Sequence, residues 1–219
     1  LLIPINENNS ATEKVHKINI SQSGDIVLMN KLKELRKKIA DDKSIPPYVI
    51  FQDPSLNEMT FRYPISTDEL SSIFGVGEGK AKKYGKDFIE LIAKHVEENN
   101  IDRPDDMVVK SAGKNSSLKL FIIQGIDRKL SVEDIAQSKS MQVEELISEM
   151  ETIVYSGTKL DLSYCIDDYL DEDQQDDLYD YFIESESDDI EQALTEFDGD
   201  YDEFELKLFR IKFLSDLAN

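Results

Sequence analysis

Residues 66–92 have the sequence STDELSSIFGVGEGKAKKYGKDFIELI. Ser66 and Glu69 have the spacing of a capping box, in which a hydroxyl and a carboxylate satisfy free backbone donors at a helix start. Apolar side chains recur at helical spacing on both sides of a glycine turn, at Leu70, Ile73, Phe74, Ala81, Tyr84, Phe88, Leu91, Ile92 and Val96. The segment therefore predicts two helices joined by a tight turn.

The residues before this segment predict further helices. Leu28, Leu32, Leu35 and Ile39 have helical spacing with lysine and arginine between them, which indicates an amphipathic helix with a basic outer face. The sequence IPP at 45–47 must end that helix, because proline lacks the backbone donor. A short helix capped by Asp53 should follow and should end at Pro64, which gives four or five helices in about 75 residues.

The glycine turn is the first element with chemical content. The free amides and the dipole at the start of the second helix favour an anion, and a nucleic-acid phosphate suits the lysines that follow. The candidate binding residues are Gly75, Gly77, Lys80, Lys82, Lys83 and Lys86. The alternative is that the glycines only permit close helix packing and the lysines only solubilise the surface. A P-loop is excluded, because three residues separate Gly75 from Gly79 and Ala81 follows Lys80.

Several motifs occur together in order over about residues 27–100: LKELR at 32–36, IPPYVIF at 45–51, LNEM at 56–59, PI at 64–65, GVG at 75–77 and KKYG at 82–85. This succession resembles an HRDC domain (helicase and RNase D C-terminal domain) of the bacterial RecQ type. The resemblance implies a helical bundle over residues 26–100 that binds single-stranded or partly single-stranded DNA. It also makes Tyr48 a candidate for stacking on a base; the alternative for Tyr48 is a half-buried core residue with its hydroxyl in water.

Charge divides the chain in two. The net charge is -1 over residues 1–100 and -20 over residues 101–219, and residues 161–206 carry 20 carboxylates without a single lysine or arginine. A segment of this kind repels nucleic acid. We therefore expect DNA to bind through residues 26–100 and a protein partner, if any, to bind through residues 101–219.

The second half is predicted to be a separate helical domain. Residues 1–25 and 101–116 are interpreted as linkers, the first with a strand at Lys17–Ile20, and residues 117–219 as an acidic C-terminal domain. A helix should run from Leu118 and stop at Gly125, and a helix-turn-helix should follow, with its first helix capped by Ser131. The exposed face of the second helix of this motif is rich in glutamate, which favours packing or protein contact over DNA recognition.

The acidic remainder is expected to be folded, because it contains several aromatic side chains: Tyr164, Tyr169, Tyr179, Tyr181, Phe182 and Phe197. Two helices are predicted around Gln174–Glu184 and Ile190–Phe197, before a final amphipathic helix. The fold class is thus all-α, with an HRDC-like bundle and a second helical domain that has a helix-turn-helix (winged-helix-like) core. This second domain resembles, less specifically, the helix-turn-helix module that follows HRDC in some bacterial RecQ helicases.

Composition excludes several classes of function. The mean hydropathy is -0.44 and no apolar run approaches the roughly 20 residues of a membrane span, so we predict no membrane association and a cytoplasmic location. Cys165 is the only cysteine, and His16 and His95 are too far apart in sequence for a metal motif. No nucleophile motif, metal set or phosphate loop is present, so no catalytic residue, metal or cofactor is assigned to this chain.

Together these features predict that the sequence is a fragment of a longer protein. Its first residue, which is leucine and not methionine, supports this expectation. We expect the accessory C-terminal region of a RecQ-type helicase at the bacterial nucleoid, acting in DNA repair and recombination, with ATP and magnesium bound by absent motor domains. Two alternatives stay open: a protein-interaction module without nucleic-acid binding, and the C-terminal part of an RNase D-like exoribonuclease.

Overall fold

The computed structural model describes residues 24–103 and 115–217, which contain eleven α-helices and one short 3-10 helix. No strand is present within these two ranges, so the all-α prediction is confirmed and the helix-turn-helix core is entirely helical there. The first range holds α1 (Ile26–Lys43), α2 (Pro47–Ile50), α3 (Asp53–Arg62), α4 (Thr67–Ser71) and α5 (Glu78–Glu98). The second holds α6 (Asn115–Asp127), α7 (Val132–Ser138), α8 (Val143–Tyr155), η1 (Ile166–Asp168), α9 (Glu172–Glu184), α10 (Ile190–Glu196) and α11 (Glu203–Leu217). The strand expected at Lys17–Ile20 and most of both predicted linkers lie outside the described residues.

Local sequence explains most helix ends of the first half. Asp25 caps α1, where its carboxylate accepts a hydrogen bond of 2.9 Å from the Leu28 amide. The Ser66 hydroxyl caps α4 as predicted, whereas the Glu69 carboxylate accepts the amide of Ile65 and thus reaches one residue further back. The expectation that Asp53 caps α3 is wrong: Asp53 is the first residue of that helix, and its carboxylate instead pairs with lysine and arginine of α1.

The first half has its own core beneath α1, α3 and α5. Phe51 fills its centre and meets Phe88 edge to face, with 4.9 Å between the ring centroids. Leu70 and Ile73 are buried in this core as expected, but Phe74 is 66% exposed. The reason is that α4 already ends at Ser71, so the backbone has left the helical path before it reaches Phe74.

In the second half, Gly125 does not end a helix, contrary to the prediction. Helix α6 continues through this glycine to Asp127. A Cβ atom at Gly125 would lie 2.8 Å from Cγ1 of Ile135 in α7, so the glycine permits two helices to approach closely. The predicted helix-turn-helix is formed by α7 and α8, and the Ser131 hydroxyl caps α7 by accepting the amide of Asp134.

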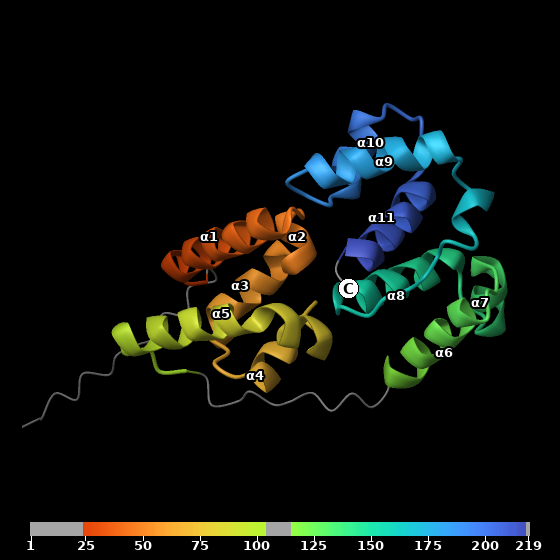
Figure 1. Cartoon of the computed structure of the whole chain (residues 1–219). Helices are drawn as coiled ribbons and strands as arrows, with labels where there is room; N and C mark the ends of the chain where they lie inside the picture. Colours follow the sequence, from red (N-terminus) through yellow and green to blue (C-terminus); the bar gives the residue numbers. More distant parts are fainter. Residues whose placement is uncertain (1–23, 104–114, 218–219) are drawn as a thin grey trace, which may run out of the picture.

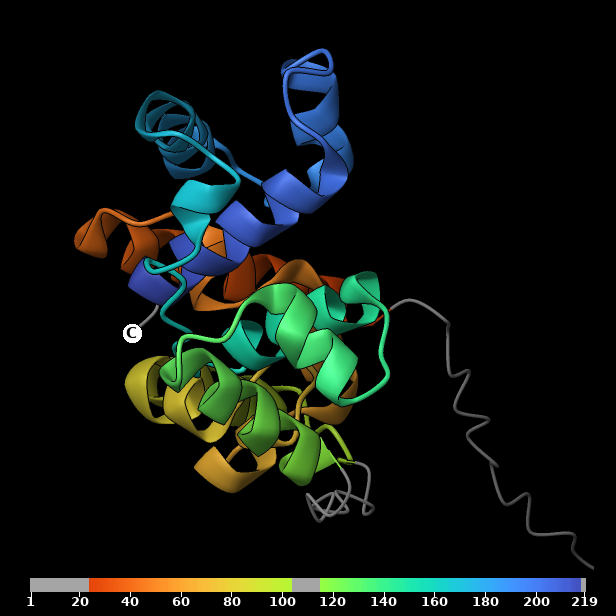
Figure 2. The same ribbon diagram turned by 90° about the vertical axis from the view of Figure 1, so that its right-hand side faces the viewer.

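Helix α11 forms the centre of the second core. Its buried side chains, among them Leu206, Phe209 and Phe213, point in all directions around the helix, which is typical of a helix enclosed by others. Helices α8, α9 and α10 contact it, and Figure 2 shows α11 passing among them. Most carboxylates of the acidic segment lie on the outside of this packed domain.

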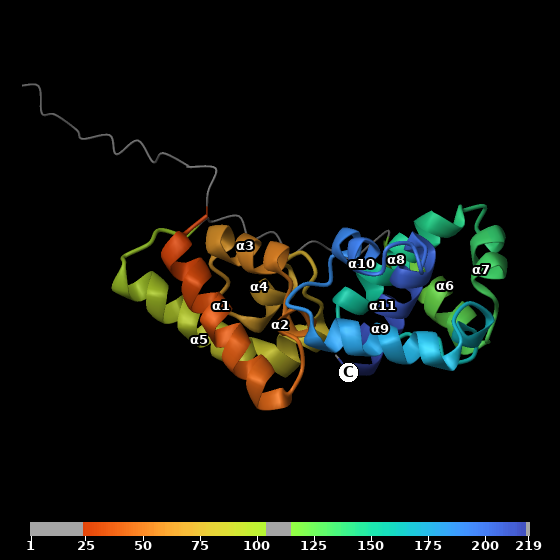
Figure 3. The ribbon, with the colours of Figure 1, turned by 90° about the horizontal axis from the view of Figure 1, so that it is seen from above.

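The two halves lie side by side in Figures 1 and 3, with α1–α5 on one side and α6–α11 on the other. Each half has a separate cluster of buried side chains. The exceptions are Tyr48 and Val49 of α2, which pack into the core of the second half. None of the described helices has the length and apolar character needed to cross a bilayer.

Candidate nucleic-acid interface

The glycine turn between α4 and α5 is held by side chains of α3. The backbone of Phe74 accepts a hydrogen bond of 2.7 Å from the Ser55 hydroxyl and donates one of 2.8 Å to the Glu58 carboxylate. Gly75 has a φ of +72°, a conformation that favours glycine. The turn is therefore held in place by α3 and leads directly into α5, whose first turns carry the predicted lysines.

The structure separates these lysines by exposure. Lys82, Lys83 and Lys86 are exposed on α5, and Lys82 forms an ion pair of 2.6 Å with Glu78. Lys80 points the other way and is only 2% exposed. Burial lowers the pKa of the Lys80 amine to about 8, although the nearby Asp188 carboxylate opposes this shift. Three of the four predicted lysines are thus exposed, and the fourth is enclosed.

Helix α1 adds basic side chains that the sequence-based candidate set omitted. The amines of Lys43 and Lys83 lie 5.9 Å and 5.3 Å from the centroid of the same ring, that of Tyr84. Lys38 is also exposed on α1 and lines a groove between α1 and α5 together with Asp87 of α5. We call Lys38, Lys43, Lys83 and Lys86 the basic strip. The basic face of α1 was visible in the sequence, but its juxtaposition with α5 depends on the tertiary fold.

Tyr48, the candidate for base stacking, is buried between the two halves. Its side chain is 3% exposed, and its hydroxyl donates a hydrogen bond to the backbone carbonyl of Phe182 in α9. The alternative of a half-buried residue with a hydrated hydroxyl does not describe this position either. In this arrangement the ring of Tyr48 cannot meet a base.

The start of α5 is covered as well. A Cβ atom at Gly77 would lie 2.1 Å from the carbonyl oxygen of Ser156, and one at Gly79 would lie 3.2 Å from that of Gly157. These carbonyls follow the last turn of α8, where the helix dipole is negative, and they face the positive start of α5. The position at which the sequence predicts an anion is therefore occupied by the end of another helix.

Asp188 organises the polar contacts at this junction. Its carboxylate accepts hydrogen bonds from the Gln52 amide of the first half, at 2.8 Å, and from the Tyr155 hydroxyl of α8. Burial and the negative charge of Asp188 both raise the pKa of that hydroxyl. Arg210 of α11 donates to the Asp188 backbone carbonyl and pairs with Glu151, so the loop before α10 is fixed from both sides.

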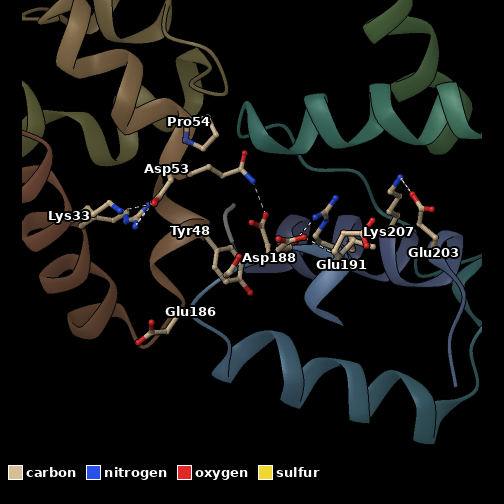
Figure 4. Close-up of a pocket in the computed structure, with 15 residues that line it drawn as sticks. Lys33, Tyr48, Asp53, Pro54, Glu186, Asp188, Glu191, Glu203 and Lys207 are labelled. Carbon is tan, nitrogen blue, oxygen red and sulfur yellow. Dashed lines mark hydrogen bonds and ion pairs between the residues drawn. The ribbon is translucent and has the colours of Figure 1, made fainter. Parts of the chain in front are cut away.

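A cleft of about 780 Å³ remains beside this network. Figure 4 shows Tyr48 and Asp188 facing the same space between the halves. Basic side chains line the cleft, but they are engaged: Lys33 pairs with Asp53, and Lys207 pairs with Glu203. Within the described residues, no group of histidine, cysteine, aspartate and glutamate side chains has the arrangement of a metal site.

Comparison with known families matches both halves. The family model of the HRDC domain matches residues 25–92, and that of the RecQ-1-like helix-turn-helix domain matches residues 116–166. The chain is 46% identical over 65 residues to the ATP-dependent DNA helicase RecQ of Bacillus subtilis and 44% identical over 68 residues to that of Haemophilus influenzae. It is 32% identical over 68 residues to the ATP-dependent DNA helicase UvrD2 of Mycobacterium tuberculosis. These matches cover 30–31% of this chain and only 10–11% of the length of each relative.

Proposed function

We propose that this chain, in which an HRDC domain precedes a RecQ-1-like helix-turn-helix domain, is the accessory C-terminal region of a RecQ-type ATP-dependent DNA helicase. The observation that carries this proposal is the order of the two domains, together with the similarity to RecQ helicases. The UvrD2 relative shares an HRDC-sized region, but the helix-turn-helix match favours RecQ over that family.

In this proposal, the HRDC domain binds single-stranded or partly single-stranded DNA and helps the helicase to select DNA structures. The basic strip supplies four exposed amines on α1 and α5, two of them beside the same ring, that of Tyr84. Amines of this kind bind phosphates without regard to sequence, and their affinity falls as salt rises because bound counterions are released. The acidic second half, with its net charge of -20, provides protein contact or restrains DNA binding.

The rest of the helicase would supply the chemistry. ATP and magnesium would bind to motor domains elsewhere in the longer protein, and the whole would act in DNA repair and recombination at the bacterial nucleoid. The relatives named above are helicases, which favours this proposal over an RNase D-like exoribonuclease.

Titration of the full chain with fluorescent oligothymidylate tests DNA binding. We expect weak binding at low salt, and Lys83→Ala should make the slope of log K against log salt shallower by about 0.7. Arg128→Ala, just after α6 in the acidic half, is the matched control, because it removes the same charge from an exposed position outside the HRDC domain. If the parent chain fails to bind at low salt, the protein-interaction alternative gains support, since the burial of Tyr48 and Lys80 is what such a module would show.

A further inference from the structure

The second half covers residues of the HRDC domain whose chemistry is suited to binding a nucleic acid. They are an aromatic ring, a lysine amine and the start of a helix: Tyr48 and Lys80 are 3% and 2% exposed, and Gly77 meets the Ser156 carbonyl. Tyr48 packs with side chains of the second core. Its ring would therefore become accessible if the halves separated.

The covering groups are those that resemble a phosphate backbone. Carbonyl oxygens of Ser156 and Gly157 lie against the start of α5, where helix amides attract anions. The Asp188 carboxylate is close enough to Lys80 to act on its amine electrostatically and also accepts the Gln52 amide. The covering half thus offers negative charge and acceptor oxygens to positions that would otherwise meet phosphates.

Separation of the halves would leave both cores largely intact. The two clusters of buried side chains are distinct. Among the described buried residues, Tyr48 and Val49 cross from one half into the core of the other, and the partly buried Ile45 packs against both cores. The remaining contacts are mostly polar and border an open cleft. Interfaces of this kind between domains permit relative motion.

We infer that the acidic half and single-stranded DNA compete for the surface around Tyr48 and the start of α5, so that DNA binds this surface only when the halves separate. This inference rests on the proposed DNA binding of the HRDC domain. The inference goes further, because it names the part of the same chain that covers this surface: the segment around Asp188 together with the end of α8. The affinity for DNA is then reduced by the fraction of molecules that are closed.

Asp188→Ala in the full chain tests the competition. The substitution removes the acceptor of Gln52 and Tyr155 while leaving every HRDC residue unchanged, so it should open the interface. We expect affinity for oligothymidylate to rise about tenfold. Asp180→Ala is the matched control, because it removes an equal charge from the exposed surface of α9, and it should change affinity less than twofold. Equal increases in both variants would show a general charge effect and overturn the inference.

Hydrogen exchange gives a readout that does not depend on affinity. Asp188→Ala should speed exchange of the amides in residues 47–52 and 182–190, and saturating oligothymidylate should do the same in the parent chain. Tyr155→Phe, which removes one donor to Asp188 and keeps the ring, is the second variant if Asp188→Ala does not fold. Faster exchange without a gain in affinity, or bound DNA that leaves both segments protected, would overturn the competition. Absence of DNA binding by the parent and by an opened variant would instead overturn the proposed function.

Discussion

The roles that the sequence indicates for Tyr48 and Lys80 differ from those that the structure shows. In the sequence both belong to a DNA-binding pattern, and in the structure both are enclosed where the two halves meet. The Tyr48 hydroxyl has a specific partner, the Phe182 carbonyl, and burial raises its pKa. Substitutions at these two positions can therefore separate packing from binding.

Tyr48→Phe should lower the free energy of unfolding by about 1 kcal/mol, because the Phe182 carbonyl loses its donor while the ring stays in place. The affinity for oligothymidylate should not fall, since phenylalanine still stacks on bases and the interface opens more easily. Tyr48→Ala should cost about 3–5 kcal/mol, as large-to-small core truncations do. Urea unfolding of the two variants checks this, and an unchanged stability of Tyr48→Phe would contradict the packing role.

Lys80→Met should stabilise the chain by roughly 3–4 kcal/mol at pH 7, because burial lowers the pKa of the amine from 10.5 to about 8 and each pKa unit corresponds to about 1.4 kcal/mol. Below about pH 8 the amine is protonated in both the folded and unfolded states, so the full cost is present. Between about pH 8 and 10.5 the folded state loses its proton first, and the cost falls.

The stability advantage of Lys80→Met over the parent should therefore shrink as pH rises above 8. Urea unfolding of the parent and of Lys80→Met at pH 7 and pH 9.5 measures the difference between their free energies of unfolding. The titration of all other groups is common to both proteins and cancels in this difference. Lys82→Met is the matched control, because Lys82 is exposed and should give no comparable gain. An advantage that grows with pH would contradict the sign of this linkage.

At the scale of elements, local sequence predicted most helices because their signals are local. Capping by Ser66 and Ser131 and the proline stop after α1 act within a few residues. The predictions that failed depend on tertiary contacts. Gly125 lies within a helix, where its lack of a side chain leaves room for Ile135. The candidate surface is covered through contacts such as that between Tyr48 and Phe182, which are 134 residues apart in sequence. Contacts at such separations leave no periodic trace in the sequence, so the composition of the candidate site could be predicted but its exposure could not.

Gly125→Ala should destabilise the chain by about 1–3 kcal/mol, although alanine is the better helix former, because its Cβ would lie 2.8 Å from Ile135 Cγ1. The double variant Gly125→Ala with Ile135→Val should recover part of this loss, because valine lacks the Cδ1 atom, which also lies within 2.9 Å. Thermal melts of the parent, both single variants and the double variant measure the coupling. Additive effects would mean that the two residues do not meet.

At the scale of the whole molecule, the decisive feature is that two separate cores meet through a small, largely polar junction. Charge does not explain the junction by itself, because the first half is nearly neutral while the second carries a net charge of -20. Specific contacts, the Tyr48 hydroxyl and the Asp188 carboxylate above all, hold the halves together. Association between the halves should therefore survive loss of the covalent link and depend on these contacts.

A chain with a specific protease site inserted within residues 104–114 checks this at the level of the whole molecule. After cleavage we expect two folded fragments, because each half has its own core, and they should elute together in size-exclusion chromatography. The same cleavage in Gln52→Ala should give fragments that separate at lower protein concentration, because the Asp188 carboxylate loses a donor. Gln137→Ala, on the exposed surface of α7, is the matched control and should behave as the parent does. Fragments that separate even without a substitution would show that the junction is too weak to cover the HRDC surface, and fragments that unfold would show that the two cores depend on each other.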